Sequence, residues 1–318
     1  MPFEDAHWVW MNGKIIPWRY ATVHVSAHAL HYGSGVFEGI RCYETSKGPA
    51  VFRLDAHLER FFASAAVHDL TIGYSRKELT KAVCQVIQRN GFPSCYVRPI
   101  CYVGSGVLSV HPRRSPVEVA IFGWPSLTQF GAEALQKGVR VTVSSWVRIH
   151  SSMMPTTAKG CGQYLNSVLA AREAVSRGFD EAVLLDTHGH ISEGSGENLF
   201  LVRGGKLLTN DERDSILLGI TRDSVIRIAR DLGYSVEVRT LKEDDLLSAD
   251  EAFFTGTAAE VTPIREVDGK AIRGGVRGPV TAKIQQAFFA AATGQNERYR
   301  AWLHYVAPAG RNKRRSRR

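Results

Sequence analysis

The sequence predicts a mixed α+β protein with two domains. Strand-like stretches alternate with amphipathic helices along most of the 318-residue chain, and an apolar fraction of 44% can fill two ordinary cores. A segment rich in turn-forming residues around Pro125 is the best linker. We therefore expect a small N-terminal domain at 1–122, an interdomain loop at 123–136, a larger domain at 137–307 and a basic tail at 308–318.

The first domain is expected to combine an antiparallel sheet with two helices. Residues 8–18 surround Asn12-Gly13, the strongest short signal for a β-hairpin. Apolar residues recur at helical spacing after Asp55, the expected N-cap, and again before Gly91. We therefore predict helices at 54–70 and 75–91, with further strands at 22–25, 36–44, 94–104 and 117–124.

The second domain repeats this mixture of strands and helices. In the first of its helices we expect Leu165, Val168, Leu169 and Val175 to face the core. No internal repeat is present. The predicted helices span 164–178, 222–233 and 278–294, and the predicted strands 139–148, 181–186, 198–202, 206–209, 234–241 and 251–256.

Charge and cysteine content exclude several classes of function. Six of the positive charges behind the net charge of +9 lie in the last eight residues, so the rest is nearly balanced. That tail has no interleaved aromatic residue to stack on bases, and we expect no nucleic-acid partner, although a binder of nucleic acid or of an anionic surface stays the alternative from another class. Five scattered cysteines predict free thiols in a reducing cytoplasm and no metal site, and no apolar run could span a membrane.

Lys159 lies in an unusual stretch, PTTAKGCGQY. It is the only residue between Arg148 and Arg172 that is certain to be charged in water. Burial among small residues would lower the pKa of its amine and make it a nucleophile for an aldehyde. Taken alone, the stretch is more typical of an exposed lysine on a polar loop.

Three further segments have the composition of ligand sites. Glu193 and Glu197 follow a strand and a tight turn in a glycine-rich setting, where a carboxylate is either solvated or paired with a buried positive group. Thr221 begins an amphipathic helix whose free N–H groups could bind an anion, or it only caps that helix. Gly256 and Thr257 follow a strand in the same way and could bind a second anion.

Together, five segments resemble the fold-type IV enzymes that use pyridoxal 5'-phosphate. These segments are HALHYGSGVFEGIRCY, AKGCGQYLNS, ISEGSGENLF, GITRD and GTAAEVTP. Within that group the resemblance is strongest to bacterial branched-chain amino acid aminotransferases, whose own signature resembles YVRP at 96–99. The resemblance implies a small α/β domain and a larger pseudo-barrel domain joined by an interdomain loop. It also implies transfer of the amino group between leucine, isoleucine or valine and 2-oxoglutarate, in amino-acid biosynthesis.

The resemblance also implies how the cofactor is bound. Lys159 would form an imine with the cofactor and then act as the catalytic base. Glu193 would pair with the ring nitrogen, Tyr164 would hydrogen-bond the ring oxygen, and Arg60 would bind the phosphate. The implied cofactor-binding residues are Arg60, Lys159, Tyr164, Glu193, Gly196, Leu218, Ile220, Thr221, Gly256 and Thr257.

For the substrate, the resemblance implies a mostly apolar cleft with one adaptable charge. The α-carboxylate would bind the amides of Thr257 and Ala258, and Arg98 would meet the side-chain carboxylate of glutamate. Tyr32 and Val110 would reach the site of a neighbouring copy, which makes a homodimer the smallest functional unit. The implied substrate-binding residues are Tyr32, Phe37, Gly39, Arg41, Tyr96, Arg98, Val110, Thr257 and Ala258.

The interdomain loop departs from the family pattern. Ser126 and Gln129 stand where the bacterial branched-chain enzymes usually carry a tryptophan and a tyrosine over the substrate. The substrate range is therefore open, and a D-amino acid, an (R)-amine, an aromatic amino acid or its keto acid is the alternative substrate.

Overall fold

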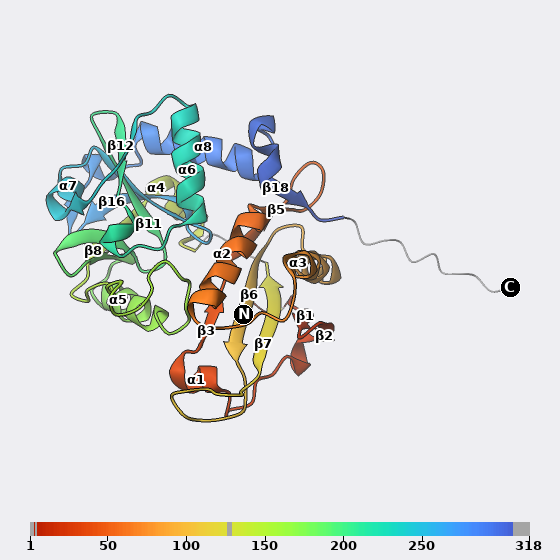
Figure 1. Ribbon diagram of the computed structural model, residues 1–318. Coiled ribbons are helices and arrows are strands. Elements are labelled where there is room, and N and C mark those ends of the chain that lie inside the picture. The colour runs from red at the N-terminus through yellow and green to blue at the C-terminus, as the bar shows by residue number, and fades with distance from the viewer. Residues whose placement is uncertain (1–2, 4, 126–128, 308–318) are drawn as a thin grey trace.

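An antiparallel β-sheet and a mixed β-sheet, each with flanking helices, form the computed structural model, which describes residues 3, 5–125 and 129–307. The second sheet lies on the left of Figure 1, and the first sheet lies in the centre and on the right. The strand order of the first sheet is β18-β5-β4-β6-β7-β1-β2, with β3 also paired to β6. Its strands are β1 (Trp8–Met11), β2 (Lys14–Pro17), β3 (Gly35–Phe37), β4 (Ile40–Tyr43), β5 (Ala50–Phe52), β6 (Cys95–Val103), β7 (Val117–Trp124) and β18 (Leu303–Tyr305).

The predicted N-terminal hairpin is confirmed. Asn12 and Gly13 connect β1 to β2, and both have positive φ, 47° and 87°, as a two-residue hairpin turn requires. The predicted strand at 36–44 is also present, but it is split into β3 and β4 at Glu38 and Gly39. That split directs β3 toward the second half of the chain, where it contacts the lysine loop.

One face of the first sheet is covered by α2 (Leu54–Val67) and α3 (Arg76–Asn90). Leu58 and Phe61 of α2 and Leu79 of α3 are fully buried there, as their helical spacing predicts. The predicted cap is wrong: Asp55 lies within the first turn, and Arg53, with φ of 52°, occupies the N-cap without a side-chain hydrogen bond. Arg53 instead bonds Asp223 and Ser224 of the second half.

The predicted strand at 22–25 is also wrong. Thr22–Val25 pair with no strand of the described residues, and Val25 is 76% exposed. The alternation of Val23 and Val25 satisfies the pattern of a strand, but a strand also needs a neighbouring edge, and this segment passes between β2 and the short helix α1 (His28–Tyr32).

The second sheet has the order β13-β12-β11-β15-β16-β8-β9-β10-β14, with β17 paired to β16, and bends into a half-barrel. Parallel pairing of β8 with β9 and with β16 makes the sheet mixed. Strands β10 and β16 lie outside the predicted strand ranges. Its strands are β8 (Val139–Val143), β9 (Glu181–Leu185), β10 (His190–Gly194), β11 (Asn198–Arg203), β12 (Lys206–Thr209), β13 (Val236–Val238), β14 (Leu241–Lys242), β15 (Glu251–Gly256), β16 (Glu260–Val267) and β17 (Lys270–Ala271).

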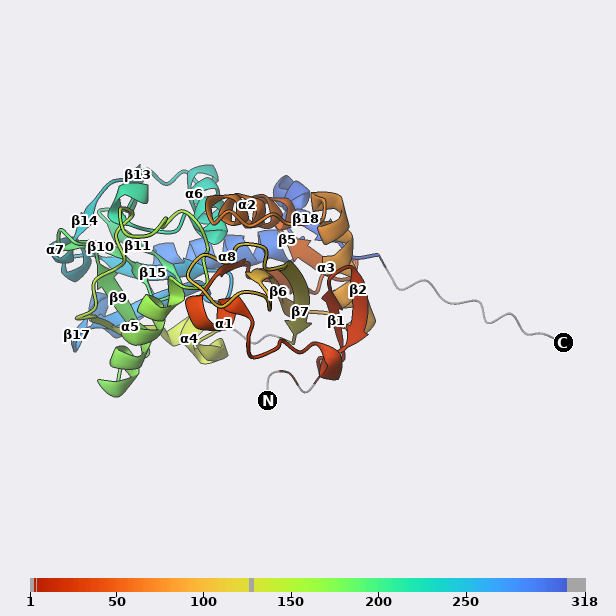
Figure 2. The same ribbon diagram turned by 60° about the horizontal axis from the view of Figure 1, so that its bottom comes forward.

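Helices α6 (Ile220–Asp231) and α8 (Pro279–Ala292) pack on one face of the second sheet. Figure 2 shows α2 beside α6, where the two halves of the molecule meet. The start of α6 therefore faces α2.

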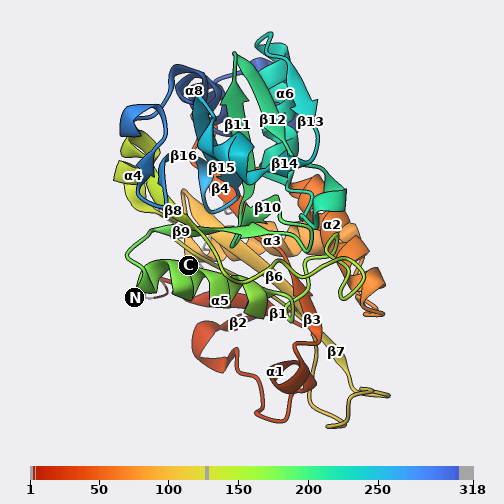
Figure 3. The same cartoon turned by 90° about the vertical axis from the view of Figure 1, so that its left-hand side faces the viewer.

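Helix α5 (Tyr164–Ser176) does not bury the predicted face. Leu165, Val168 and Val175 are 65%, 47% and 68% exposed, whereas Ala170 and Ala174 are buried. The helix packs closely on β9 through these small residues, and its larger apolar side chains point away. Figure 3 shows α5 on the outside of the molecule.

The predicted domain boundaries stay predictions. Strand β18, from the range assigned to the second domain, pairs with β5 of the first sheet, and α4 (Gly131–Lys137) occupies part of the expected loop. The tail at 308–318 lies outside the described residues. No helix among the described residues is long and apolar enough to cross a membrane.

Candidate functional site

The backbone around Lys159 is fixed to strand β3. The Phe37 N–H donates to the Lys159 carbonyl over 3.1 Å, and the Cys161 N–H donates to the Gly35 carbonyl over 2.8 Å. The two segments approach so closely that a Cβ on Gly33 would lie 2.7 Å from the Gly162 Cα. The lysine is therefore held at the junction of the two sheets.

The Lys159 amine lies in an aromatic setting. Its Nζ donates to the Tyr164 hydroxyl over 2.5 Å and lies 5.0 Å from the centroid of the Phe37 ring. No carboxylate of the described residues forms an ion pair with it. The backbone N–H of Lys159 also donates to Ser64 Oγ on α2. Both ends of the residue are thus anchored, the backbone by Ser64 and the amine by the Tyr164 hydroxyl.

Glu193 is a buried carboxylate with three donors. Arg148 Nη2 lies 2.7 Å from its Oε1, and Asn198 Nδ2 and the Leu217 N–H donate to its Oε2 over 3.0 and 3.1 Å. Burial raises the pKa of Glu193, and the Arg148 guanidinium and the Leu217 N–H oppose that rise. A buried carboxyl of this kind is a suitable partner for a basic ring nitrogen.

Arg60 connects the first half of the molecule to the start of α6. Its Nη1 donates to the Leu218 carbonyl over 3.0 Å, and its other two nitrogens donate to the buried carboxylate of Glu38. Gly219 is the N-cap of α6 and supplies no side-chain cap, so the first N–H groups of the helix, at Ile220 and Thr221, are free for an anion.

The turn between β15 and β16 forms another rim of the site. Its Ala258 carbonyl accepts the Gln129 N–H over 3.1 Å and lies 3.5 Å from Arg41 Nη1. Arg41 Nε also lies 3.5 Å from Glu260, whose pKa is raised by burial. Arg41 therefore connects the Ala258 carbonyl of this turn to the Glu260 carboxylate at the start of β16.

Arg98 and its aromatic neighbours lie next to the lysine loop. The Arg98 guanidinium carbon is 4.6 Å from the Phe37 ring centroid and 5.4 Å from that of Tyr96. Its Nε is buried without a hydrogen-bond partner among the described residues. Gly39 is required beside them, because a Cβ there would lie 1.8 Å from the Tyr96 hydroxyl.

Tyr32 and Val110 are not brought to this site. They are 46% and 84% exposed, on α1 and on the loop between β6 and β7. Ser126, the other position at which the sequence departs from the family pattern, lies outside the described residues.

Most of the predicted cofactor residues surround one hollow. Leu218 is the exception, because it takes part only through its carbonyl. The predicted residues that line the hollow are Arg60, Lys159, Tyr164, Glu193, Gly196, Ile220, Thr221, Gly256 and Thr257.

These residues fit pyridoxal phosphate. The hollow presents an amine, an anion site made by Arg60 and the start of α6, and the buried acid Glu193. Thr255 Oγ1, which lines it, is buried without a hydrogen-bond partner among the described residues. An aldehyde, a phosphate and a ring nitrogen would each meet the group that binds it.

Sequence reasoning missed Glu38, His57, Arg148 and Asn198. Glu38 is fully buried and accepts from Arg60 and His57, and Arg148 and Asn198 bond Glu193. Glu38 and Asn198 lie inside segments that resemble the family, so the sequence offered a reason to consider them. Nothing in the sequence pointed to His57 or Arg148, because a histidine in a helix and an arginine at the end of a predicted strand are common in any fold.

A second polar cluster lies on the hairpin between β9 and β10. Ligand atoms of Asp186, His190 and Asp214 all lie within 4.8 Å of one another. Asp186 Oδ1, however, accepts the backbone N–H groups of His188 and His190 over 2.8 Å each, and Asp214 accepts from Thr240. These hydrogen bonds explain the cluster, because they stabilise the turn between β9 and β10.

The chain is similar to known aminotransferases over nearly its whole length. Residues 35–267 match the model of the amino-transferase class IV family. A branched-chain-amino-acid aminotransferase of Pseudomonas aeruginosa is 45% identical over 94% of this chain and 97% of its own length. Among solved structures, the crystal structure of the Escherichia coli branched-chain amino acid aminotransferase matches with a TM-score of 0.93 and 45% identity, over 95% of this chain and 100% of that one. A crystal structure of a T.th. branched-chain amino acid aminotransferase with pyridoxamine 5'-phosphate matches with a TM-score of 0.92 and 48% identity, over 95% of this chain and 99% of that one.

Proposed function

Since the chain belongs to the class IV aminotransferase family, we propose that the site around Lys159 transfers the amino group between branched-chain L-amino acids and 2-oxoglutarate. The protein is a pyridoxal-phosphate-dependent branched-chain-amino-acid transaminase. The single observation that carries the assignment of the site is that the amine of Lys159, the anion site at Arg60 and the acid Glu193 line one hollow.

When bound, pyridoxal phosphate supplies an aldehyde that takes the amino group and a ring that withdraws electrons from the substrate α-carbon. Lys159 would bind that aldehyde and later move the proton at the α-carbon, a task for which the neighbouring Tyr164 hydroxyl keeps the amine oriented. Glu193 would hold a proton at the ring nitrogen. Arg60 and the N–H groups of Ile220 and Thr221 would bind the phosphate.

Substrate binding is proposed to use the rim opposite Glu193. The amides of Thr257 and Ala258 would bind the α-carboxylate, and Phe37 with Tyr96 would form an apolar wall. Arg98, caged by aromatic rings and with its Nε unpaired among the described residues, is free to meet the second carboxylate of glutamate. An apolar wall with one mobile guanidinium suits a site that takes both leucine and glutamate.

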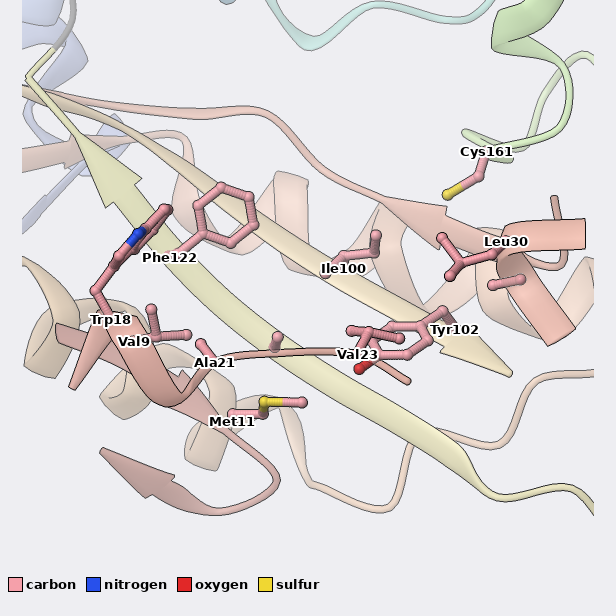
Figure 4. Close-up of a pocket in the computed structure, with 12 residues that line it drawn as sticks. Val9, Met11, Trp18, Ala21, Val23, Leu30, Ile100, Tyr102, Phe122 and Cys161 are labelled. Atoms are coloured by element: carbon pink, nitrogen blue, oxygen red, sulfur yellow. The ribbon is translucent and has the colours of Figure 1, made fainter. Parts of the chain in front are cut away.

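We also propose that the functional unit is at least a homodimer. Figure 4 shows the residues that line an apolar groove on the uncovered face of the first sheet, among them Trp18, Val23, Leu30, Ile100 and Phe122. Tyr32, Val110 and the outward apolar residues of α5 are exposed as well. Apolar area of this extent supports burial against a second copy. The five free cysteines support a reducing cytoplasm as its compartment.

Addition of single substrates to the purified, cofactor-loaded protein tests the function. L-isoleucine and L-glutamate should each bleach the visible absorbance of the bound cofactor, because each converts it to the amine form. Lys159→Ala should lose the absorbance of the lysine-bound form while keeping the fold. Bleaching by D-alanine or an (R)-amine, with none by L-isoleucine, would overturn the substrate assignment. An unchanged absorbance in Lys159→Ala would overturn the role of the lysine.

A further inference from the structure

A buried hydrogen-bonded group stands behind the proposed phosphate site, and two of its three members, Glu38 and His57, have no role in the function described so far. It consists of Glu38, at the junction of β3 and β4, and of His57 and Arg60, three residues apart on α2. Glu38 is 0% exposed and His57 is 2% exposed. Burial of a carboxylate is unfavourable unless its hydrogen-bond partners are well placed, so the contacts of Glu38 need to be explained.

Both carboxylate oxygens of Glu38 are hydrogen-bonded. Arg60 donates through Nε to Oε1 over 2.6 Å and through Nη2 to Oε2 over 3.0 Å, which is the two-pronged geometry of a guanidinium on a carboxylate. His57 Nδ1 lies 2.7 Å from Oε2, and the Gly39 N–H donates to the same oxygen over 3.2 Å. Burial alone would raise the pKa of Glu38, but the Arg60 guanidinium and the His57 hydrogen bond outweigh burial and hold it well below its usual range.

These contacts fix the orientation of the Arg60 guanidinium. Two of its five N–H groups go to Glu38 and one goes to the Leu218 carbonyl, just before the start of α6. The other two, one on each terminal nitrogen, have no hydrogen-bond partner among the described residues. A free arginine side chain loses rotamer entropy when it binds an anion, and one whose orientation is already fixed loses less.

Glu38 also belongs to the backbone of the substrate wall. It stands between Phe37 and Gly39, and its own N–H donates to the Pro99 carbonyl of β6 over 2.9 Å. The carboxylate that holds Arg60 is therefore part of the segment that holds Phe37 against the Lys159 loop.

Building on the proposed function, we propose that Glu38 is a positioning residue for the cofactor phosphate, acting by fixing the Arg60 guanidinium against the start of α6. It does not touch the reacting atoms. His57 supports it as a neutral donor, because burial lowers the pKa of His57 below its ordinary value, an effect that Glu38 only partly opposes.

Binding of two cofactor analogues tests this inference. Protein freed of cofactor is titrated with pyridoxal 5'-phosphate and, separately, with pyridoxal, which lacks the phosphate. Glu38→Gln should weaken binding of the phosphorylated form about tenfold or more and leave pyridoxal binding within about twofold. The exposed Glu59→Gln on the same helix is the matched control and should bind both as the original protein does.

Two further measurements separate positioning from loss of structure. Glu38→Asp, which keeps the charge but shortens its reach, should show a smaller loss confined to the phosphorylated form. The double variant of Glu38→Gln with Arg60→Gln should bind no worse than Arg60→Gln alone, because Glu38 acts through Arg60.

The outcomes are distinguishable. Equal weakening of both analogues, or additive losses in the double variant, would overturn the inference, as would unchanged binding in both Glu38 variants. If the original protein bound no pyridoxal phosphate, the proposed function itself would fail. A changed phosphorus NMR shift of the bound cofactor in Glu38→Gln, with the shift of Glu59→Gln unchanged, would support the inference independently of activity.

Discussion

The side-chain amide of Gln129 donates to Glu197 Oε1 over 2.6 Å, and this bond joins the segment between the two sheets to the cofactor hollow. The backbone N–H of Gln129 also donates to the Ala258 carbonyl, on the turn proposed to bind the substrate carboxylate. A glutamine at this position, where the family resemblance leads one to expect a tyrosine, therefore fastens the segment by polar contacts.

Replacing Gln129 by leucine should weaken substrate binding more than catalysis. Loss of one hydrogen bond to a buried carboxyl is worth about 1 kcal/mol, so KM for L-isoleucine should rise about fivefold, with kcat changed less than about twofold. Glu133→Gln, on the exposed side of α4, is the control and should leave both constants unchanged. Steady-state kinetics with both substrates decides this, and an equal fall of kcat would contradict a binding role.

Glu197 should make the free energy of unfolding depend on pH. Burial, followed by the nearby Glu181, raises the pKa of Glu197 to about 8. Between its ordinary pKa of 4.5 and about 8, the folded chain keeps a proton that the unfolded chain has lost. The contribution of Glu197 to the free energy of unfolding therefore falls as pH rises through that window, by at most about 1.4 kcal/mol per pH unit.

Glu197→Gln should accordingly lose stability less steeply between about pH 5 and 8. Urea unfolding of protein freed of cofactor measures the slope, because the ionisation of the cofactor would otherwise add to it. The exposed Glu44→Gln should keep the original slope. Parallel slopes for Glu197→Gln and the original protein would show that Glu197 does not hold a proton in the folded state.

Gly39→Ala should damage the substrate wall. The added Cβ would lie 1.8 Å from the Tyr96 hydroxyl, so Tyr96, which is 7% exposed, must leave its position. We expect KM for branched-chain substrates to rise at least about tenfold, while the absorbance of the bound cofactor is retained. Gly73→Ala, where nothing lies within 4 Å of the added Cβ, should behave as the original protein. Normal kinetics for Gly39→Ala would mean that Tyr96 is not needed where the structure places it.

Sequence periodicity predicted helices well where one face is apolar and the ends carry signals. Helix α3 ends at Gly91, with φ of 69°, as its glycine predicts. Helix α5 shows the limit, because the pattern of Leu165, Val168 and Val175 is real but faces outward. Periodicity locates an apolar face without saying which partner covers it, and small residues can supply the inner contact when a helix packs closely on a sheet.

By itself the sequence determined the class of protein and predicted Lys159 as the reactive lysine, because the glycine-rich motifs around Lys159, Glu193 and Thr257 are local and stand in the family's order. Only the tertiary structure decided which polar groups support them. Glu38 and Arg60 are 22 positions apart, Arg148 lies far from Glu193 in the sequence, and each pair is joined by contacts that no local pattern encodes. Buried charges acquire a function from their partners, and the fold alone brings those partners together.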